Sequence, residues 1–163
     1  MQYEVGDKVI HWAYGVGEIV QIDTKKLGGQ DGTYYKVQVR DLTIWVPVKE
    51  TNKSSLRPPT SARKFKKALE ILRETGIELS NDRLERKNWL SESLRSGCLE
   101  DVCRVIRDLS AYAKAKKLND NDSLVLERAK NLLLEEWRLS LDIPLAEAQK
   151  QLKSILDEGG VNK

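Results

Sequence analysis

The side chains that most often act in catalysis or bind metals are scarce in this chain of 163 residues. His11 is the only histidine, and Cys98 and Cys103 are the only cysteines. His11 falls in an alternating segment, where packing or one hydrogen bond is the usual role, and no acid/base partner can be assigned to it. Two thiols and one imidazole are too few for a structural zinc site. We therefore expect no catalytic site, no metal and no cofactor.

Longer motifs lead to the same expectation. The sequence has no glycine-rich phosphate loop ending in Lys-Ser or Lys-Thr, no dinucleotide-binding fingerprint and no Gly-x-Ser-x-Gly turn. Cys98 and Cys103 lie on different faces of a predicted helix, so we interpret them as buried thiols in a reducing compartment. No apolar run is long enough to span a membrane, and residues 1–9 lack the apolar core of a signal peptide. We expect a cytoplasmic protein that is not an enzyme and does not contact a membrane.

Basic side chains are the remaining group with clear chemistry, because they can bind phosphates. The net charge is only +3, but residues 1–60 hold eight Lys and Arg against seven Asp and Glu, whereas residues 61–95 hold nine against six. The basic residues clustered in the second segment are Arg63, Lys64, Lys66, Lys67, Arg83, Arg86 and Lys87. Such a cluster fits a footprint for nucleic-acid phosphates, but solvated helix faces give the same pattern, and charge alone favours the solvated face.

These basic residues follow a change in the character of the chain near residue 58. Short alternating segments separated by glycine-rich turns, including a hairpin loop at residues 27–32, give way to helical periodicity. Runs of strands followed by runs of helices indicate an α+β chain in two domains. We expect a small, strongly bent β-sheet or barrel in residues 1–58 and an all-α bundle of about five helices in residues 59–163. The Ser- and Pro-rich segment 52–61 is the predicted linker.

The predicted strand Leu42–Val48 is the most distinctive element of the first domain. Its alternation places Ile44, Val46 and Val48 on one face and Thr43, Trp45 and Pro47 on the other. Pro47 cannot donate a ladder hydrogen bond, so we expect this strand at a sheet edge. An edge strand that carries Trp45 fits a docking strand; alternatively, Trp45 covers a second small core. The neighbouring strand, Thr33–Arg40, should turn Tyr35, Val37 and Val39 inward.

The second domain is predicted from the three-four spacing of apolar residues. The expected N-caps are Ser61, the segment Ser80–Asp82, and Asp120 or Asp122, with Pro144 at the start of the last helix. Leu99–Lys117 has the clearest helical pattern, Gly76 is expected to end the first helix, and Gly159 to begin a frayed tail. The positions expected to face the core include Phe65, Leu69, Leu72, Leu84, Leu90, Leu94, Leu126, Ala129, Leu133, Trp137, Leu145, Ala148, Leu152 and Ile155.

Several motifs, taken in their order and spacing, carry a family likeness. They are Val5-Gly6-Asp7-Lys8-Val9-Ile10, Tyr14-Gly15-Val16-Gly17-Glu18-Ile19, Tyr34-Tyr35, Ile44-Trp45-Val46-Pro47-Val48, Ser96-Gly97, Val105-Ile106-Arg107-Asp108-Leu109 and Ala129-Lys130. The set covers most of the chain and resembles the CarD/CdnL family of bacterial transcription regulators. Its first part resembles the RNA-polymerase-interacting domain that this family shares with transcription-repair coupling factors.

The resemblance implies a Tudor-like β-domain that docks on the β subunit of RNA polymerase, partly by strand addition. At the matching positions Lys25 and Trp45 would contact the polymerase, and Thr43 and Pro47 share the outward face of Trp45. The resemblance also implies that the helical domain contacts promoter DNA at the upstream edge of the bubble. There a wedged Trp at the minor groove would stabilise the open complex. We expect the protein to be a monomer.

The sequence departs from this family in the DNA-contacting segment. Counting back from Ser96-Gly97, Arg83 occupies the position of the wedge Trp, and the basic run that follows becomes Glu85-Arg86-Lys87-Asn88. Trp89 faces about 120° away from Arg83 on a helix, so we interpret Trp89 as a core residue. Arg83 could enter a narrow minor groove, and Arg86 and Lys87 could contact phosphates. Arg83, Arg86, Lys87 and Trp89 are therefore the candidate DNA-binding residues.

Two functions of different class follow. The first is a CarD-like regulator that binds the polymerase β subunit through residues 1–58 and modulates open-complex stability through its helical domain. The alternative is a polymerase-binding adaptor whose helical domain docks another protein, which Arg83 at the Trp position and the small net charge favour. An enzyme of unrecognised type is disfavoured by the single histidine and the absence of a clustered site.

Overall fold

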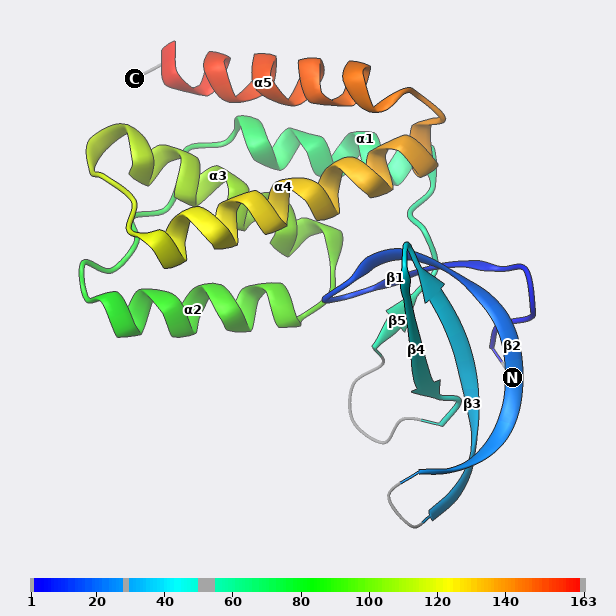
Figure 1. The fold of residues 1–163 in the computed structure, drawn as a ribbon. Helices are drawn as coiled ribbons and strands as arrows, with labels where there is room; N and C mark the ends of the chain where they lie inside the picture. Colours follow the sequence, from blue (N-terminus) through cyan, green and yellow to red (C-terminus); the bar gives the residue numbers. More distant parts are fainter. Residues whose placement is uncertain (1, 28–29, 50–54, 162–163) are drawn as a thin grey trace. The chain divides into compact units, whose positions relative to one another are not determined.

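The structure is a computed structural model that describes residues 2–27, 30–49 and 55–161 (Figure 1). The chain divides into two compact units, Met1–Pro59 and Thr60–Lys163, which we call the β unit and the helical unit. The β unit is a curled antiparallel sheet, and the described part of the helical unit contains only helices and their connections. The expected α+β fold class is therefore confirmed. The predicted hairpin loop includes residues 28–29, and the predicted linker includes residues 52–54. Both stretches lie outside the described residues.

The described residues of the β unit form five strands. They are β1 (Lys8–His11), β2 (Gly15–Leu27), β3 (Gln30–Val39), β4 (Leu42–Pro47) and β5 (Leu56–Arg57). They pair antiparallel in the order β4-β3-β2-β1-β5, so β4 lies at the sheet edge, as predicted. The long β2 and β3 curl together (Figure 1), and their register shifts between Ile19 and Gln21. An extra residue at such a bulge bends a strand and increases its twist, which helps the sheet to close over its core.

The core of the β unit lies inside this curl. Tyr35, Val37 and Val39 of β3 are all buried, which confirms the predicted alternation. Gly17 of β2 passes directly over two of these side chains: a Cβ atom at Gly17 would lie 2.8 Å from Val37 Cγ1 and 2.9 Å from Val39 Cγ2. Only a residue without a side chain therefore allows β2 to approach β3 so closely.

Residues 60–161, the described part of the helical unit, form five α-helices and one short 3₁₀ helix. They are α1 (Ala62–Leu69), η1 (Glu70–Arg73), α2 (Arg83–Arg95), α3 (Leu99–Ala115), α4 (Asp120–Leu141) and α5 (Leu145–Val161). The helices α3 and α4 pack side by side at the centre, with α2 on one side and α1 and α5 on the other (Figure 1). In the core between α4 and α1, the side chains of Trp137 and Phe65 are fully buried, and their ring centres are 5.8 Å apart.

Side-chain caps set where these helices begin. The Ser61 hydroxyl accepts from the Lys64 N–H, and the Asp82 carboxylate accepts from the Leu84 and Glu85 N–H groups, so both predicted caps are confirmed. Just before the Ser61 cap, the Thr60 N–H and hydroxyl both donate to the Oε2 atom of Glu136, at 3.0 and 2.6 Å. Glu136 is buried in the C-terminal third of α4, so the first residue of the helical unit is bonded to its central helix.

Several predicted details of the helical unit are wrong. Asn119, rather than Asp120 or Asp122, caps α4. The Asn119 side chain accepts a hydrogen bond from the Asp122 N–H, and the Asp122 carboxylate accepts one from the Asn119 N–H. Leu84 is 66% exposed and Leu145 is 38% exposed, because both lie in the first turn of a helix, beyond the edge of the core. The first helix changes to 3₁₀ geometry at Glu70, before Gly76, and α5 continues through Gly159 to Val161.

Candidate functional site

The outer edge of β4 is the first candidate surface. The Val48 N–H donates to the Thr33 carbonyl at 2.9 Å. Because the direction of backbone groups alternates along an antiparallel strand, those of Val46 and Ile44 also point to β3, whereas those of Thr43, Trp45 and Pro47 point to the outer edge. Pro47, which has no N–H, therefore occupies a position where the pairing with β3 needs none.

The β4 side chains follow the predicted division into two faces. Val46 is buried, and Ile44 and Val48 pack against the core of the β unit. On the opposite face, Thr43 and Pro47 are exposed and Trp45 is half-buried. The Trp45 ring lies beside the ammonium of Lys36 from β3, which is 5.8 Å from the ring centre. Trp45 belongs to neither apolar core of the described residues, so its ring is held at the surface by its sheet neighbours.

Lys25 and the β4 residues come from different strands. Lys25 lies in β2 opposite Gly32 of β3, and β3 separates it from β4 in the strand order. Trp45, by contrast, lies opposite Lys36 in the β3–β4 pair. The strand pairing thus brings Thr43, Trp45 and Pro47 together on one edge and leaves Lys25 two strands inward.

The predicted DNA-binding residues lie on α2 but do not share one face. Arg83 and Lys87 are both exposed, and their spacing of four residues places them on the same side of the helix. Trp89 is 42% exposed, so its interpretation as a core residue is wrong. It lies on the other flank of α2, about 120° from Arg83, with the exposed carboxylate of Glu85 one turn before it.

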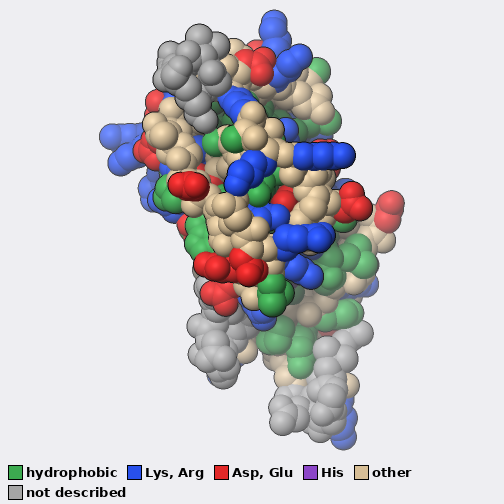
Figure 2. Space-filling model, turned by 90° about the vertical axis from the view of Figure 1, so that its left-hand side faces the viewer, with side chains coloured by type: hydrophobic (Ala, Val, Ile, Leu, Met, Phe, Trp, Pro, Cys, Tyr) green, Lys and Arg blue, Asp and Glu red, His purple; other side chains and the backbone are tan. Residues whose placement is uncertain are grey.

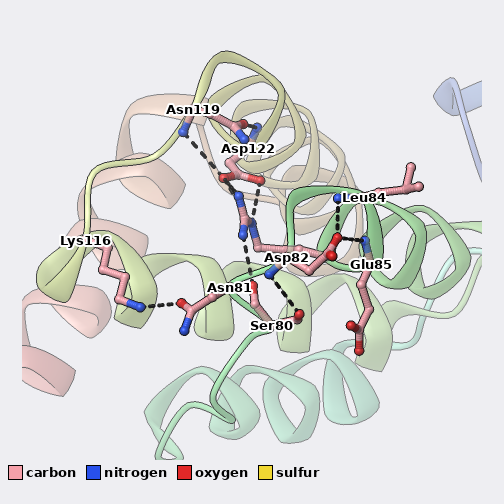
Figure 3. Close-up of polar contacts among 9 residues, drawn as sticks. Ser80, Asn81, Asp82, Leu84, Glu85, Lys116, Asn119 and Asp122 are labelled. Carbon is pink, nitrogen blue, oxygen red and sulfur yellow. Dashed lines mark hydrogen bonds and ion pairs between the residues drawn. The ribbon is translucent and has the colours of Figure 1, made fainter.

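Arg86 points into the helical unit rather than toward solvent. Its side chain is only 4% exposed. Its guanidinium donates to both carboxylate oxygens of Asp122 at 3.0 to 3.2 Å and to the Ser80 carbonyl at 2.9 Å (Figure 3). The Tyr112 ring lies against it, 5.0 Å from ring centre to guanidinium carbon. All three guanidinium nitrogens donate to partners within the protein and the side chain is buried, so we do not retain Arg86 as a phosphate contact.

The bond to Asp122 gives Arg86 a structural role instead. The hydrogen bond to Asp122 raises the pKa of Arg86, so the side chain stays charged despite its burial. The pair joins the start of α2 to the start of α4, where Asp122 also completes the Asn119 cap. Beside this pair, the Lys116 ammonium donates a hydrogen bond to the Oδ1 atom of Asn81 (Figure 3). Together with the buried Leu90 and Leu94, these contacts set the rotation of α2 and therefore the directions of Arg83 and Lys87.

His11 and Cys103 are packed into the two units, as predicted, whereas Cys98 is less buried than expected. His11 is buried, and its Nδ1 atom accepts hydrogen bonds from the Ala13 and Tyr14 N–H groups at 3.0 and 3.3 Å. Cys103 is fully buried, and burial raises the pKa of its thiol to about 12. Cys98 is half-buried at the start of α3.

Two further searches concern only the described residues. Among residues 2–27, 30–49 and 55–161, no group of three or more His, Cys, Asp or Glu side chains is arranged to hold a metal ion. In the same part of the chain, no helix combines the length and the apolar character that crossing a membrane requires.

Two family descriptions match the two halves of the chain. Residues 3–60 match the CarD-like/TRCF RID domain, and residues 67–153 match the CarD, C-terminal domain. The chain belongs to the CarD family. The Bacillus subtilis (strain 168) protein named "Putative transcription factor YdeB" is 25% identical over 158 residues, an alignment that covers 93% of this chain and 98% of that protein. The resemblance to this family of transcription regulators is thus confirmed.

Both candidate surfaces fall inside the parts of the chain that match the CarD family. The RID is an RNA-polymerase-interacting domain, and it contains Lys25 and the whole of β4. The match to the C-terminal domain contains the whole of α2. Figure 2 shows one face of the molecule, on which Lys and Arg side chains alternate with Asp and Glu over the helical unit. This CarD-family chain therefore does not present a uniformly basic surface on that face.

Proposed function

We propose that this protein docks on the β subunit of RNA polymerase through the outer edge of β4 and modulates the stability of open promoter complexes through its helical unit. The observation that carries the proposal is the position of β4. It is the last strand of the sheet, its Thr43, Trp45 and Pro47 backbone groups point outward, and it lies within the RNA-polymerase-interacting domain.

Docking by strand addition would use both properties of this edge. Main-chain hydrogen bonds supply affinity in that mode, and alternate side chains supply specificity. Pro47 contributes a carbonyl but no N–H at the end of β4, which limits how far an added strand can pair. Trp45 offers a large, rigid ring beside the edge, and Trp is a frequent hot spot at interfaces. Lys25, two strands inward, is a second proposed polymerase contact.

The DNA part of the proposal rests on Arg83 and Lys87. Both are exposed on one side of α2, whose opposite side buries Arg86, Leu90 and Leu94. Arg83 can enter a narrow minor groove, where the negative potential is strongest, and Lys87 can bind an adjacent phosphate. Trp89 supplies an exposed ring on the other flank of the helix. Holding the upstream DNA in this way opposes closure of the bubble.

The docking claim is tested with the intact protein and the isolated lobe of the polymerase β subunit. We expect binding by the wild-type chain and a loss of about 2 kcal/mol, roughly 30-fold in Kd, for Trp45→Ala, because truncated hot-spot residues cost this much. Trp89→Ala is the matched control, since it truncates the same residue type in the other unit and should bind normally. No binding by the wild-type protein, or equal binding by Trp45→Ala, would contradict the claim.

The DNA claim is tested through the salt dependence of binding to a forked promoter duplex. The double variant Arg83→Gln/Lys87→Gln should lower the slope of log K against log[salt] by about 1.8, since each phosphate contact contributes about 0.9. Lys150→Gln/Lys153→Gln, which removes two exposed charges from α5, is the control and should leave the slope near the wild-type value. The open-complex lifetime should fall only with the first pair. An unchanged slope would remove Arg83 and Lys87 from the site.

A second candidate function is an adaptor whose helical unit docks another protein. The exposed apolar side chains Leu84 and Trp89, together with the exposed Glu85 between them on α2, favour it. Aromatic residues are enriched at protein interfaces, whereas a carboxylate opposes DNA. Failure of the wild-type chain to bind forked DNA, together with crosslinks from α2 to a protein partner, would select this function.

A further inference from the structure

The exposed face of α1 differs in charge from every other described helix. α1 buries Phe65, Ala68 and Leu69 against the core of the helical unit. Its remaining side chains are Ala62 and four cations, and all of these are exposed. The cations are Arg63, Lys64, Lys66 and Lys67. Residues 61–69 contain no Asp or Glu, whereas α2, α3, α4 and α5 each carry both signs of charge.

The helical period spreads these cations over the whole solvent side of α1. With 100° per residue, Arg63 and Lys67 lie near the middle of that side, and Lys64 and Lys66 lie on its two flanks. Arg63 and Lys67 are about 6 Å apart along the helix axis, at a rise of about 1.5 Å per residue. The result is a compact face made of four positive side chains, with no apolar side chain larger than alanine.

This arrangement is unfavourable for an isolated helix. Arg63 and Lys64 lie in the first turn, where the helix dipole disfavours cations, and no acidic residue is present there to offset them. Lys67 lies three and four residues after Lys64 and Arg63, spacings at which like charges repel. Among the ion pairs of the described residues, none includes a side chain of this face. A bound polyanion would remove each of these costs.

We propose that the exposed face of α1, formed by Arg63, Lys64, Lys66 and Lys67, is a second DNA-contacting surface that binds duplex phosphates without sequence preference. The inference rests on the proposed function only in taking DNA as the polyanion. Three of the four cations lie in residues 61–66, between the segments that match the two CarD-family domains, so neither match accounts for them. Basic contacts to phosphates position a protein on the duplex and do not read its sequence.

The composition of the face favours DNA over an acidic protein. Protein interfaces bury an apolar or aromatic centre, which this face lacks. Duplex DNA carries one negative charge per about 1.7 Å of its axis, so four closely spaced cations meet several phosphates at once. Lysine, which supplies three of the four cations, binds phosphate as a point charge and tolerates many geometries.

The test uses the full chain and a labelled duplex of random sequence. The variant Arg63→Gln/Lys64→Gln/Lys66→Gln/Lys67→Gln should lower the slope of log K against log[salt] by up to about 3.6, since each phosphate contact contributes about 0.9. Glutamine is a good helix former, so circular dichroism should show the same helix content as the wild type. The affinity should fall by the same factor for a second duplex of unrelated sequence.

A matched control removes the same charge elsewhere. Lys117, Arg128, Lys150 and Lys153 are exposed and scattered over the helical unit, and their replacement by Gln also removes one Arg and three Lys. This variant should lose less than about 1 from the slope, because scattered charges release few counterions. Equal losses in the two quadruple variants, or no loss in the α1 variant, would overturn the proposal.

Two further comparisons distinguish this inference from the proposed function. If Arg83→Gln/Lys87→Gln lowers the slope and the α1 variant does not, the α1 inference fails and the proposed function stands; the reverse result supports α1 and removes α2. If the wild-type chain does not bind DNA, both fail. Binding of poly-L-glutamate by the wild type, lost in the α1 variant, would then assign this face to an acidic protein partner.

Discussion

The strand β4 and the helix α2 each present a proposed contact surface, but different forces orient the two surfaces. In β4, pairing with β3 decides which residues point outward, so Thr43, Trp45 and Pro47 share the edge whatever their side chains are. In α2, the buried side chains set the rotation of the helix, and therefore the directions of Arg83 and Lys87: Arg86 pairs with Asp122, and Leu90 and Leu94 pack in the core.

The difference explains why the two surfaces respond differently to changes in sequence. A strand edge keeps its backbone groups and its alternation through most substitutions, so a docking strand can be preserved while single side chains vary. A helix surface consists only of side chains, so one substitution changes its chemistry directly. Arg83 is the proposed case of such a change, since the resemblance to the family implies a wedge Trp at that position, whereas Pro47 lies where the β4 ladder needs no donor.

The largest expected effect concerns the pair that orients α2. Arg86→Met should lower the free energy of unfolding of the helical unit by about 3–5 kcal/mol, because it leaves the buried Asp122 carboxylate without its charge partner. The double variant Arg86→Met/Asp122→Leu should recover most of this loss, since a buried ion pair replaced by apolar groups is often neutral. Urea unfolding followed by circular dichroism measures both. Lys87→Met is the exposed control and should change the free energy of unfolding by no more than about 0.5 kcal/mol. If Arg86→Met lowered the free energy of unfolding by the same small amount, the pair would not orient α2.

The second test concerns the close approach of β2 to the buried side chains of β3 at Gly17. Gly17→Ala should destabilise the β unit by about 1–3 kcal/mol, because its Cβ would overlap the buried Val37 and Val39 side chains. Gly32→Ala is the milder comparison, since its Cβ would meet only the Tyr34 ring, at 3.2 Å. Amide hydrogen exchange of β2 and β3 reports the β unit alone. Similar exchange in the two variants would argue against the close approach at Gly17.

A third test separates the two sides of β4. Thr43→Pro should weaken binding to the polymerase β-subunit lobe about tenfold, roughly 1.4 kcal/mol, because it removes an outward N–H that an added strand would use. It removes no backbone bond to β3, only the exposed hydrogen bond from the Thr43 hydroxyl to Gln38 Oε1, so the sheet should remain folded. Ile44→Pro, whose N–H points to β3, should instead unfold the edge. If Thr43→Pro folds and binds as the wild type does, docking does not use the main chain of this edge.

The smallest expected effect is on the outer side of α2. Trp89→Ala should change the free energy of unfolding by less than about 1 kcal/mol, because its side chain is 42% exposed and little packing is lost. Trp137→Ala provides the contrast, since deletion of a fully buried Trp costs about 3–5 kcal/mol. Thermal or urea unfolding of both variants measures the difference. A large loss for Trp89→Ala would mean that Trp89 supports the fold rather than a contact surface.

Local patterns were sufficient to predict most of the elements. The alternation of Tyr35, Val37 and Val39 identified β3, and Pro47 placed β4 at an edge, because strand periodicity and proline chemistry act within a few residues. Ser61 and Asp82 were recognisable caps for the same reason. The family motifs, read in order, were enough to identify the CarD family.

The features that sequence reasoning missed depend on distant partners. Arg86 looked like a surface cation because its partner, Asp122, is 36 residues away and belongs to another helix. Trp89 was interpreted as a core residue because it lies about 120° from Arg83, but Arg86, Leu90 and Leu94 form the buried face of α2 and leave Trp89 exposed. The N-cap of α4 was misassigned because Asn119, Asp120 and Asp122 are all good cap residues, and only the reciprocal bonds of Asn119 with Asp122 decide among them.

The bond between Thr60 and Glu136 has a mechanical consequence for a protein proposed to hold two partners at once. Tension that arrives along the linker reaches Thr60 first, and two hydrogen bonds pass it to the buried Glu136 in the C-terminal third of α4. The load therefore enters the helical unit at a buried position, next to the core residue Trp137. It does not peel α1 away from its Ser61 cap, so the basic face of α1 can stay folded while the linker is pulled.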